Sequence, residues 1–222
     1  MNVTVPTVVP IFATPFGVVP LPAAGSLNTT LGALLAARAA ADGDPQRGAN
    51  PLLYRSVDDL LDWADPSVQA VAREILRGIY SVVAGVNTFT DAQLRSFATQ
   101  ARAWFTIIRQ DGALAAASHP LTSWCGIYCV AAPSASASRR DSGVLRLYES
   151  RLGTMFADAT NSAMSLPYLP GHYAWQPVPG QLAVFPASVT HEIGTIRAPG
   201  EIVLVTMRVR FVAPGQTGWS KW

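Results

Sequence analysis

Three histidines are the residues of this sequence with the clearest capacity for chemistry. His119, His172 and His191 all lie in the C-terminal half, and His119 and His191 each border an apolar run that is typical of a strand. Neutral imidazole binds iron, zinc, copper or nickel, and two histidines with one carboxylate are a common site for ferrous iron. A lone histidine is more often an ordinary polar residue, so the paired placement at strand borders is what favours a metal site.

The two cysteines, Cys125 and Cys129, lie in one expected strand and point to the same face of it. Four residues of strand span about 13 Å, which is too far for a disulfide between them. The sequence has no CxxC motif and no disulfide framework, so we expect a protein of the reducing cytoplasm. If that face is a barrel interior, a thiol lies near the metal; a buried structural cysteine is the alternative.

The elements that must position these residues are short strands. Six apolar runs, separated by Gly, Pro and Ser and without helices between them, predict an antiparallel sandwich or barrel. In the last run, odd and even positions from Ile202 to Phe211 form two distinct faces, and Arg208 and Arg210 share the face of Ile202. The six predicted strands are 103–109, 124–133, 143–150, 172–178, 181–187 and 201–211.

The N-terminal half is predicted to be mainly helical, as a layer over residues 28–102 packed on the β core. Thr29 or Thr30 could cap a helix over 31–41, and Asp65 could cap an amphipathic helix that follows it. Another helix is expected to begin at Thr90 and to continue to about Phe105. Residues 1–25 contain five prolines and suit an edge strand or an extended arm.

Composition narrows the functional classes. The 222 residues are 50% hydrophobic and 14% charged, with a net charge of +2, so we expect one globular domain and neither a disordered chain nor an electrostatic binder of nucleic acid. No uninterrupted apolar run is long enough for a membrane span. We therefore expect a fold of α+β class over 1–222, with an arm (1–25), a helical layer (28–102), a β core (103–213) and a tail (214–222).

Two motifs connect these residues to a known family. GQLAVFPASVTHEI (180–193) is the more specific and SGVLRLYESR (142–151) is the next. Together with the other β runs, over about 110 residues from Ala103 to Phe211, they resemble the Fe(II)- and 2-oxoglutarate-dependent oxygenases, and more narrowly a bacterial and phage subgroup of them. The resemblance implies a double-stranded β-helix (a cupin-like jelly roll) with the metal at its mouth and His191 as the distal metal ligand. It also implies Fe(II) and 2-oxoglutarate as cofactors, and C–H oxidation of a small organic substrate.

The sequence departs from the family at the metal motif. The family's HxH falls on residues 117–119, so Ala117 stands at one ligand position and His119 at the other. His119 and His191 are then two metal ligands. A third could come from Asp141, Glu149 or His172, or from water.

The sequence also departs from the family at the cosubstrate motif. The arginine that holds the far carboxylate of 2-oxoglutarate falls on Ile202, and Arg208 appears six residues later, beyond Thr206 on the same face. Arg208 could anchor a carboxylate bidentately from another direction, or be a solvated strand-end residue. The second tyrosine of the family's YYV motif, often a cosubstrate contact, is Cys129. Other candidates for holding an acid are Arg151, which matches a family arginine, and Arg197.

Three functions are compatible with these motifs and with the departures from them. The first is an Fe(II)- and 2-oxoglutarate-dependent oxygenase, which we favour. The second is a metalloenzyme of the same fold with a three-histidine site and no 2-oxoglutarate. The third is a jelly roll that binds or supports without catalysis, as a fold alone does not imply function. We expect a small-molecule substrate, and the N-terminal arm and the Trp-ended tail would suit a homodimer that exchanges its ends.

Overall fold

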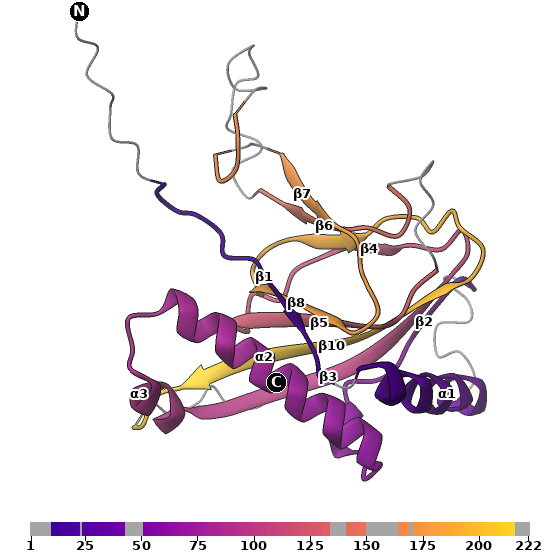
Figure 1. Ribbon diagram of the computed structural model, residues 1–222, viewed down its shortest axis with the longest axis horizontal. Coiled ribbons are helices and arrows are strands. Elements are labelled where there is room, and N and C mark those ends of the chain that lie inside the picture. Colours follow the sequence, from indigo (N-terminus) through magenta and orange to yellow (C-terminus); the bar gives the residue numbers. More distant parts are fainter. Residues whose placement is uncertain are drawn as a thin grey trace, which may run out of the picture.

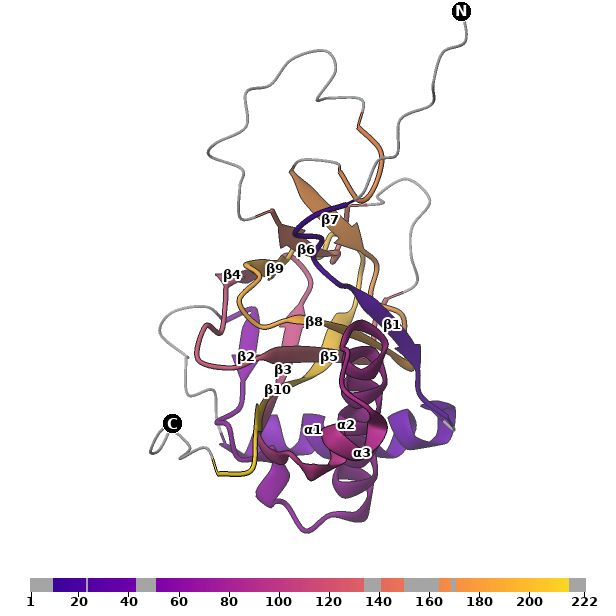
Figure 2. The same cartoon turned by 90° about the vertical axis from the view of Figure 1, so that its left-hand side faces the viewer.

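Two antiparallel sheets face each other, and helices cover the outer side of the larger one (Figures 1 and 2). The computed structural model describes residues 10–22, 24–42, 51–133, 141–149, 164–168 and 171–215. The six-stranded sheet has the order β1 (Gly17–Pro20), β8 (Gln181–Pro186), β5 (Trp124–Ala131), β10 (Glu201–Val212), β3 (Ala98–Arg109) and β2 (Leu53–Arg55). The four-stranded sheet has the order β4 (Leu114–Ala117), β9 (His191–Ile193), β6 (Leu145–Tyr148) and β7 (His172–Trp175).

All six predicted strands are confirmed, as β3, β5, β6, β7, β8 and β10. The short strands β2, β4 and β9 were not expected, because runs of three or four residues carry too little alternation to be recognised. The proline-rich arm contributes β1 at one edge of the larger sheet, where a proline at the strand end interrupts no ladder. No helix in the described part of the chain is long and apolar enough to cross a membrane.

The helices α1 (Ala24–Asp42) and α2 (Pro66–Val86) pack on the outer face of the six-stranded sheet. Asp65 caps α2 as predicted, since its carboxylate accepts hydrogen bonds from the backbone N–H groups of Ser67 and Val68. The predicted cap of α1 is wrong. Thr29 and Thr30 lie inside the helix, where their hydroxyls donate to backbone carbonyls four residues earlier.

The helix expected over residues 90–105 is much shorter. The helix α3 spans Asp91–Ser96 and begins with the capping box of Thr90 and Gln93, but Phe97 is already extended and β3 starts at Ala98. All twelve residues of β3 pair with β10. The long ladder overrides the local helical periodicity, and the boundary between the helical and β parts lies at 97–98 rather than near 103.

The six-stranded sheet has a different core on each face. Toward the helices, β10 contributes Val203, Val205, Met207 and Val209. Toward the small sheet, it contributes Ile202 and Leu204, which pack with Cys125, Ile127 and Cys129 of β5 and with residues of β6 and β9. The predicted two-faced pattern of this strand is confirmed, and the face that carries both cysteines is the interior between the sheets. Both cysteines are free.

Candidate metal centre and its arginine cluster

Three potential ligands converge at one end of the space between the sheets. One ligand atom of each of His119, Cys125 and His191 lies within 4.8 Å of the other two, and within the described residues this is the only such group of histidine, cysteine or acidic side chains. Cys125 comes from β5, His191 is the first residue of β9, and His119 lies in the connection between β4 and β5. The backbone N–H of His119 donates to the carbonyl of Ala187 over 2.7 Å, which ties this connection to the end of β8.

His191 is held in one orientation by its backbone surroundings. Its Nδ1 lies 3.0 Å from the carbonyl oxygen of Val189, and its side chain is buried with a residue exposure of 3%. Because a carbonyl only accepts hydrogen bonds, Nδ1 carries the proton and Nε2 keeps the lone pair that a metal would bind. Burial also lowers the pKa of His191. The Phe185 ring, 4.9 Å away between centroids, supports the imidazole from the side.

The surroundings of His119 also favour its neutral form. Desolvation lowers its pKa to about 4, and the neighbouring charges of His191, Arg208 and Arg55 act in the same direction. Its ring lies 5.4 Å from the Trp104 ring and 5.6 Å from that of His191, with edge-to-face geometry in both cases. At neutral pH this imidazole therefore offers a lone pair without first losing a proton.

Cys125 is the third member of the group. It is fully buried, and desolvation raises the pKa of its thiol to about 12. The thiol is thus protonated unless a metal binds the thiolate and releases the proton. Ala117, at the position of the missing family histidine, pairs directly with His191 across β4 and β9. A methyl group stands there, and β5 of the facing sheet brings the sulfur atom of Cys125 to the group instead.

The other predicted third ligands lie elsewhere. His172 is exposed on β7, opposite Tyr148, and its ring lies 6.0 Å from that of Tyr148. Glu149 follows β6, where its N–H donates to the carbonyl of Gly171. Asp141 is exposed in the turn before β6. None of them joins the group around His191. Sequence reasoning considered Cys125 near the metal only on the condition that its face was interior, a condition that the structure meets.

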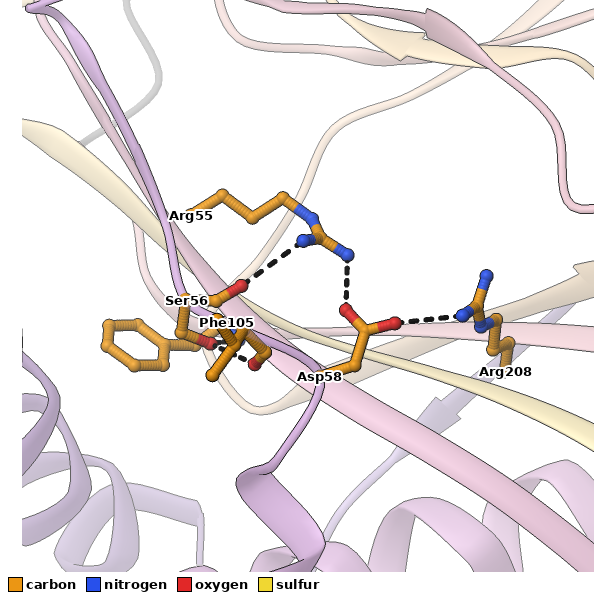
Figure 3. A network of polar contacts seen from close by, with 6 residues as sticks. Arg55, Ser56, Asp58, Phe105 and Arg208 are labelled. Carbon is orange, nitrogen blue, oxygen red and sulfur yellow. Dashed lines mark hydrogen bonds and ion pairs between the residues drawn. The ribbon is translucent and has the colours of Figure 1, made fainter. Parts of the chain in front are cut away.

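Arg208 is held in a cluster of charges (Figure 3). Its Nη2 lies 2.8 Å from Oδ2 of Asp58, while Arg55 binds the other oxygen of the same carboxylate through its own Nη2. Arg55 also donates to the carbonyl of Ser56, and the Ser56 hydroxyl accepts from the N–H of Phe105. We name Arg55, Asp58 and Arg208 the arginine cluster.

The arginine cluster adjoins the candidate metal ligands. The guanidinium carbons of Arg55 and Arg208 lie 4.5 Å and 5.5 Å from the centroid of the Trp104 ring, which in turn contacts His119. Arg208 is also the register partner of Cys125 in the ladder of β10 with β5. Sequence reasoning missed Arg55 and Asp58, because both precede the β half and no motif marks them.

The deeper part of the interior is apolar. Ile202, at the position of the family arginine, is 1% exposed and packs with Leu204 and Cys129. Desolvation raises the pKa of the Cys129 thiol to about 12, and its sulfur lies 3.5 Å from the carbonyl of Ala131. Thr206 is buried between its register partners, Trp104 and Ile127. Arg197 forms a long contact with Asp111 near the surface, and Arg151 lies outside the described residues.

The donor set fits a transition metal. Two neutral imidazoles and one thiol suit ferrous iron, zinc or copper, and an Nδ1 proton fixed on a carbonyl is the usual support of a metal-bound histidine. The arrangement differs from two histidines with one carboxylate, because no acidic side chain of the described residues belongs to the group. The cation-rich cluster beside it suits a carboxylate-bearing ligand.

One protein family matches the part of the chain that holds this group. The sequence profile of the family described as "Putative 2OG-Fe(II) oxygenase" matches residues 102–203, which run from β3 to the beginning of β10 and include His119, Cys125 and His191. A search of curated proteins finds no match.

Solved structures of low sequence identity share the fold. A prolyl-4-hydroxylase from Pseudomonas putida has a TM-score of 0.55 at 16% identity, over 90% of this chain and 93% of its own. HygX from Streptomyces hygroscopicus, solved with nickel and 2-oxoglutarate bound, has a TM-score of 0.58 at 11% identity, over 95% and 87%. A prolyl hydroxylase from Trichoplax adhaerens, in complex with a peptide fragment, has a TM-score of 0.56 at 12% identity, over 93% and 88%.

The resemblance to the 2-oxoglutarate- and Fe(II)-dependent oxygenases is therefore confirmed. The β half of the sequence matches this enzyme family, and the fold is the one its members share. Of the departures from the family, Ala117 pairs with the candidate ligand His191, and Ile202 lies in the interior between the sheets.

Proposed function

We propose that this protein is an Fe(II)- and 2-oxoglutarate-dependent oxygenase that oxidises a C–H bond of a small organic substrate. The observation that carries the proposal is the convergence of His119, His191 and Cys125 within 4.8 Å, inside the region that matches the oxygenase family. In such enzymes bound iron supplies the activation of O₂. One oxygen atom enters succinate as 2-oxoglutarate loses CO₂, and the other enters the substrate.

Different residues of the chain would bind the metal, bind the carboxylate and exclude water. His119 and His191 would bind iron through neutral imidazoles, and Cys125 would be the third protein ligand in place of Asp141, Glu149 or His172. Arg208 would bind a carboxylate beside the metal, and Thr206, its neighbour on the same face of β10, lies further into the interior. The apolar residues around Leu204 would exclude water from the reacting atoms.

A cavity of about 340 Å³ offers space for a substrate. It lies beside His191, because its lining includes Val189, whose carbonyl holds the imidazole, and Leu147, the register partner of His191. Its walls are largely apolar and aromatic, and the rings of Phe16 and Tyr173 lie 5.0 Å apart between centroids in a tilted arrangement. Such a lining favours a small, mainly apolar organic molecule over a nucleic acid.

The test is an anaerobic titration of the metal-free protein with Fe(II), followed by 2-oxoglutarate. We expect a visible charge-transfer band from the chelated keto acid, and succinate formation once O₂ is admitted. His191→Ala should lose both signals. His172→Ala is the matched control for the charge-transfer band alone, because this exposed histidine lies outside the ligand group but lines the proposed substrate cavity, and it should keep the band.

A metalloenzyme of the same fold that does not use 2-oxoglutarate is the second candidate, and the apolar surroundings of Ile202 favour it. The expected result is then tight iron binding without the charge-transfer band. The geometry would support two histidines and a thiolate rather than three histidines, because His172 is not in the group. Absence of metal binding in the wild-type protein would contradict both enzyme proposals and favour a jelly roll used for binding alone.

A further inference from the structure

The arginine cluster already has the form of an occupied carboxylate site. Asp58 offers one oxygen to Arg55 and the other to Arg208, so two guanidinium groups converge on a single carboxylate (Figure 3). This is the way in which a protein commonly binds the acid group of a ligand. Here the acid belongs to the chain itself.

A ligand could reach the same position. The side chains of Arg55, Asp58 and Arg208 are 34%, 27% and 23% exposed, so the cluster is shielded but open to solvent. Water reaches these partly buried ion pairs and screens them, so a second carboxylate can replace the first without leaving either arginine unpaired. Two guanidinium charges face one carboxylate charge, which leaves a net charge of +1 in the cluster.

The position of the cluster relates it to the metal ligands. The two guanidinium groups lie over Trp104, whose ring contacts His119, and Arg208 is level with Cys125 in the ladder of β10 with β5. An acid group bound there would place the rest of its molecule beside His119. By contrast, the described residues that pack with Ile202 in the interior are apolar.

We infer that Arg55 and Arg208 form a carboxylate-binding site beside the metal centre, and that Asp58 occupies this site until the carboxylate of a ligand displaces it. Arg55 and Arg208 are then binding residues, and Asp58 is an internal competitor that sets the affinity. The inference deepens the proposed function and rests on it for the identity of the acid, which is either 2-oxoglutarate or an acidic substrate. The binding of a carboxylate itself needs no metal.

The test is calorimetric titration of the metal-free protein with succinate and with 2-oxoglutarate. Loss of a charge-assisted hydrogen-bonding partner should weaken binding roughly tenfold or more in Arg55→Gln. Asp58→Asn should tighten binding several-fold, because the competing charge is gone. Opposite changes in carboxylate affinity in the two variants distinguish a binding site from a purely structural ion pair. If the ion pair were only structural, both substitutions would weaken binding.

Arg38→Gln is the matched control. Arg38 also lies over a tryptophan, 5.1 Å from the ring of Trp63, and pairs with Asp42 at 2.9 Å, but it belongs to α1 on the outer layer. It should leave carboxylate binding unchanged. Thermal unfolding verifies that each variant is folded, and Arg55→Lys, which keeps the charge but not the fork of donors, replaces Arg55→Gln if the latter unfolds.

Metal-loaded protein separates the two sources of the acid. If Arg55→Gln abolishes the preference for 2-oxoglutarate over 2-oxopentanoate, which lacks the far carboxylate, the site holds the cosubstrate. If that preference survives while succinate binding to metal-free protein is still weakened, the site serves an acidic substrate. Carboxylate binding that is absent, or that is insensitive to both Arg55→Gln and Asp58→Asn, overturns the inference. Loss of iron binding with carboxylate binding retained would contradict the proposed function alone.

Discussion

At the scale of single residues, the site combines candidate metal ligands that burial keeps uncharged. His119 has its pKa lowered to about 4 mainly by desolvation, while the thiol of Cys125 has its pKa raised to about 12 by the same cause. The lowered pKa leaves the imidazole neutral and able to bind a metal at once. The raised pKa keeps the thiol protonated until a metal binds its sulfur. Opposite shifts from one cause follow from the opposite charges of the two ionised forms.

The lowered pKa of His119 predicts an acid-sensitive fold in the metal-free protein. The unfolded chain takes up the proton near pH 6.5 and the folded chain near pH 4, so this contribution to stability is complete above 6.5 and is lost as the pH falls toward 4. His119→Asn should show a shallower decline over this interval in urea unfolding. His172→Asn, at an exposed position, is the control, and an unchanged slope in His119→Asn would contradict the prediction.

The two cysteines provide a matched pair for the metal site. Both are buried on the same face of β5 and both thiols have pKa values raised to about 12, but only Cys125 belongs to the ligand group. Cys125→Ala should weaken Fe(II) binding strongly, and Cys129→Ala should leave it near the wild-type value. Equal effects in a competition titration would mean that the sulfur of Cys125 does not bind the metal.

Ile202 allows the missing arginine to be tested directly. Ile202→Arg should not restore the family's mode of binding the cosubstrate, because the side chain is 1% exposed and its neighbours are apolar. An unpaired buried charge is expected to destabilise the fold by about 3 kcal/mol or more. Chemical denaturation measures this cost, and a stable variant with tighter 2-oxoglutarate binding would disprove the expectation.

At the scale of elements, local sequence signals decide where the helices begin, whereas long-range strand pairing decides where α3 ends. The caps at Asp65 and Thr90 could be predicted because an N-cap bonds to backbone groups two or three residues away. The end of α3 could not, because Ala98 and Ala101 suit a helical face as well as a strand. Their state is decided by pairing with Val212 and Val209, more than a hundred residues later.

The cap of α2 gives the prediction at this scale. Asp65→Ala removes an acceptor for the N–H groups of Ser67 and Val68 and should reduce the free energy of unfolding by about 1 kcal/mol. Metal and carboxylate binding should not change, since α2 packs on the far face of the large sheet. Equilibrium denaturation and the iron titration together check both halves of this expectation.

At the scale of the whole molecule, the general arrangement of the site was accessible from sequence, but its composition was not. The strand order brings His119 and His191 together as the family resemblance implied. Arg55 and Asp58 arrive from β2 and the segment after it, which join the sheet at the edge beyond β3. A contact between residues 58 and 208 has no local signature, and only the assembled sheet reveals it.

The two cores of the large sheet have a consequence for how this protein could have changed over time. Cys129 and Ile202, two positions at which the sequence departs from the family, lie with Cys125 on the face toward the small sheet, whereas the opposite face packs against the helices in a separate core. Substitutions on the first face can alter chemistry while the second continues to hold the chain together. Such substitutions are tolerated when the new side chain is uncharged, because an unpaired charge buried between the sheets destabilises the fold.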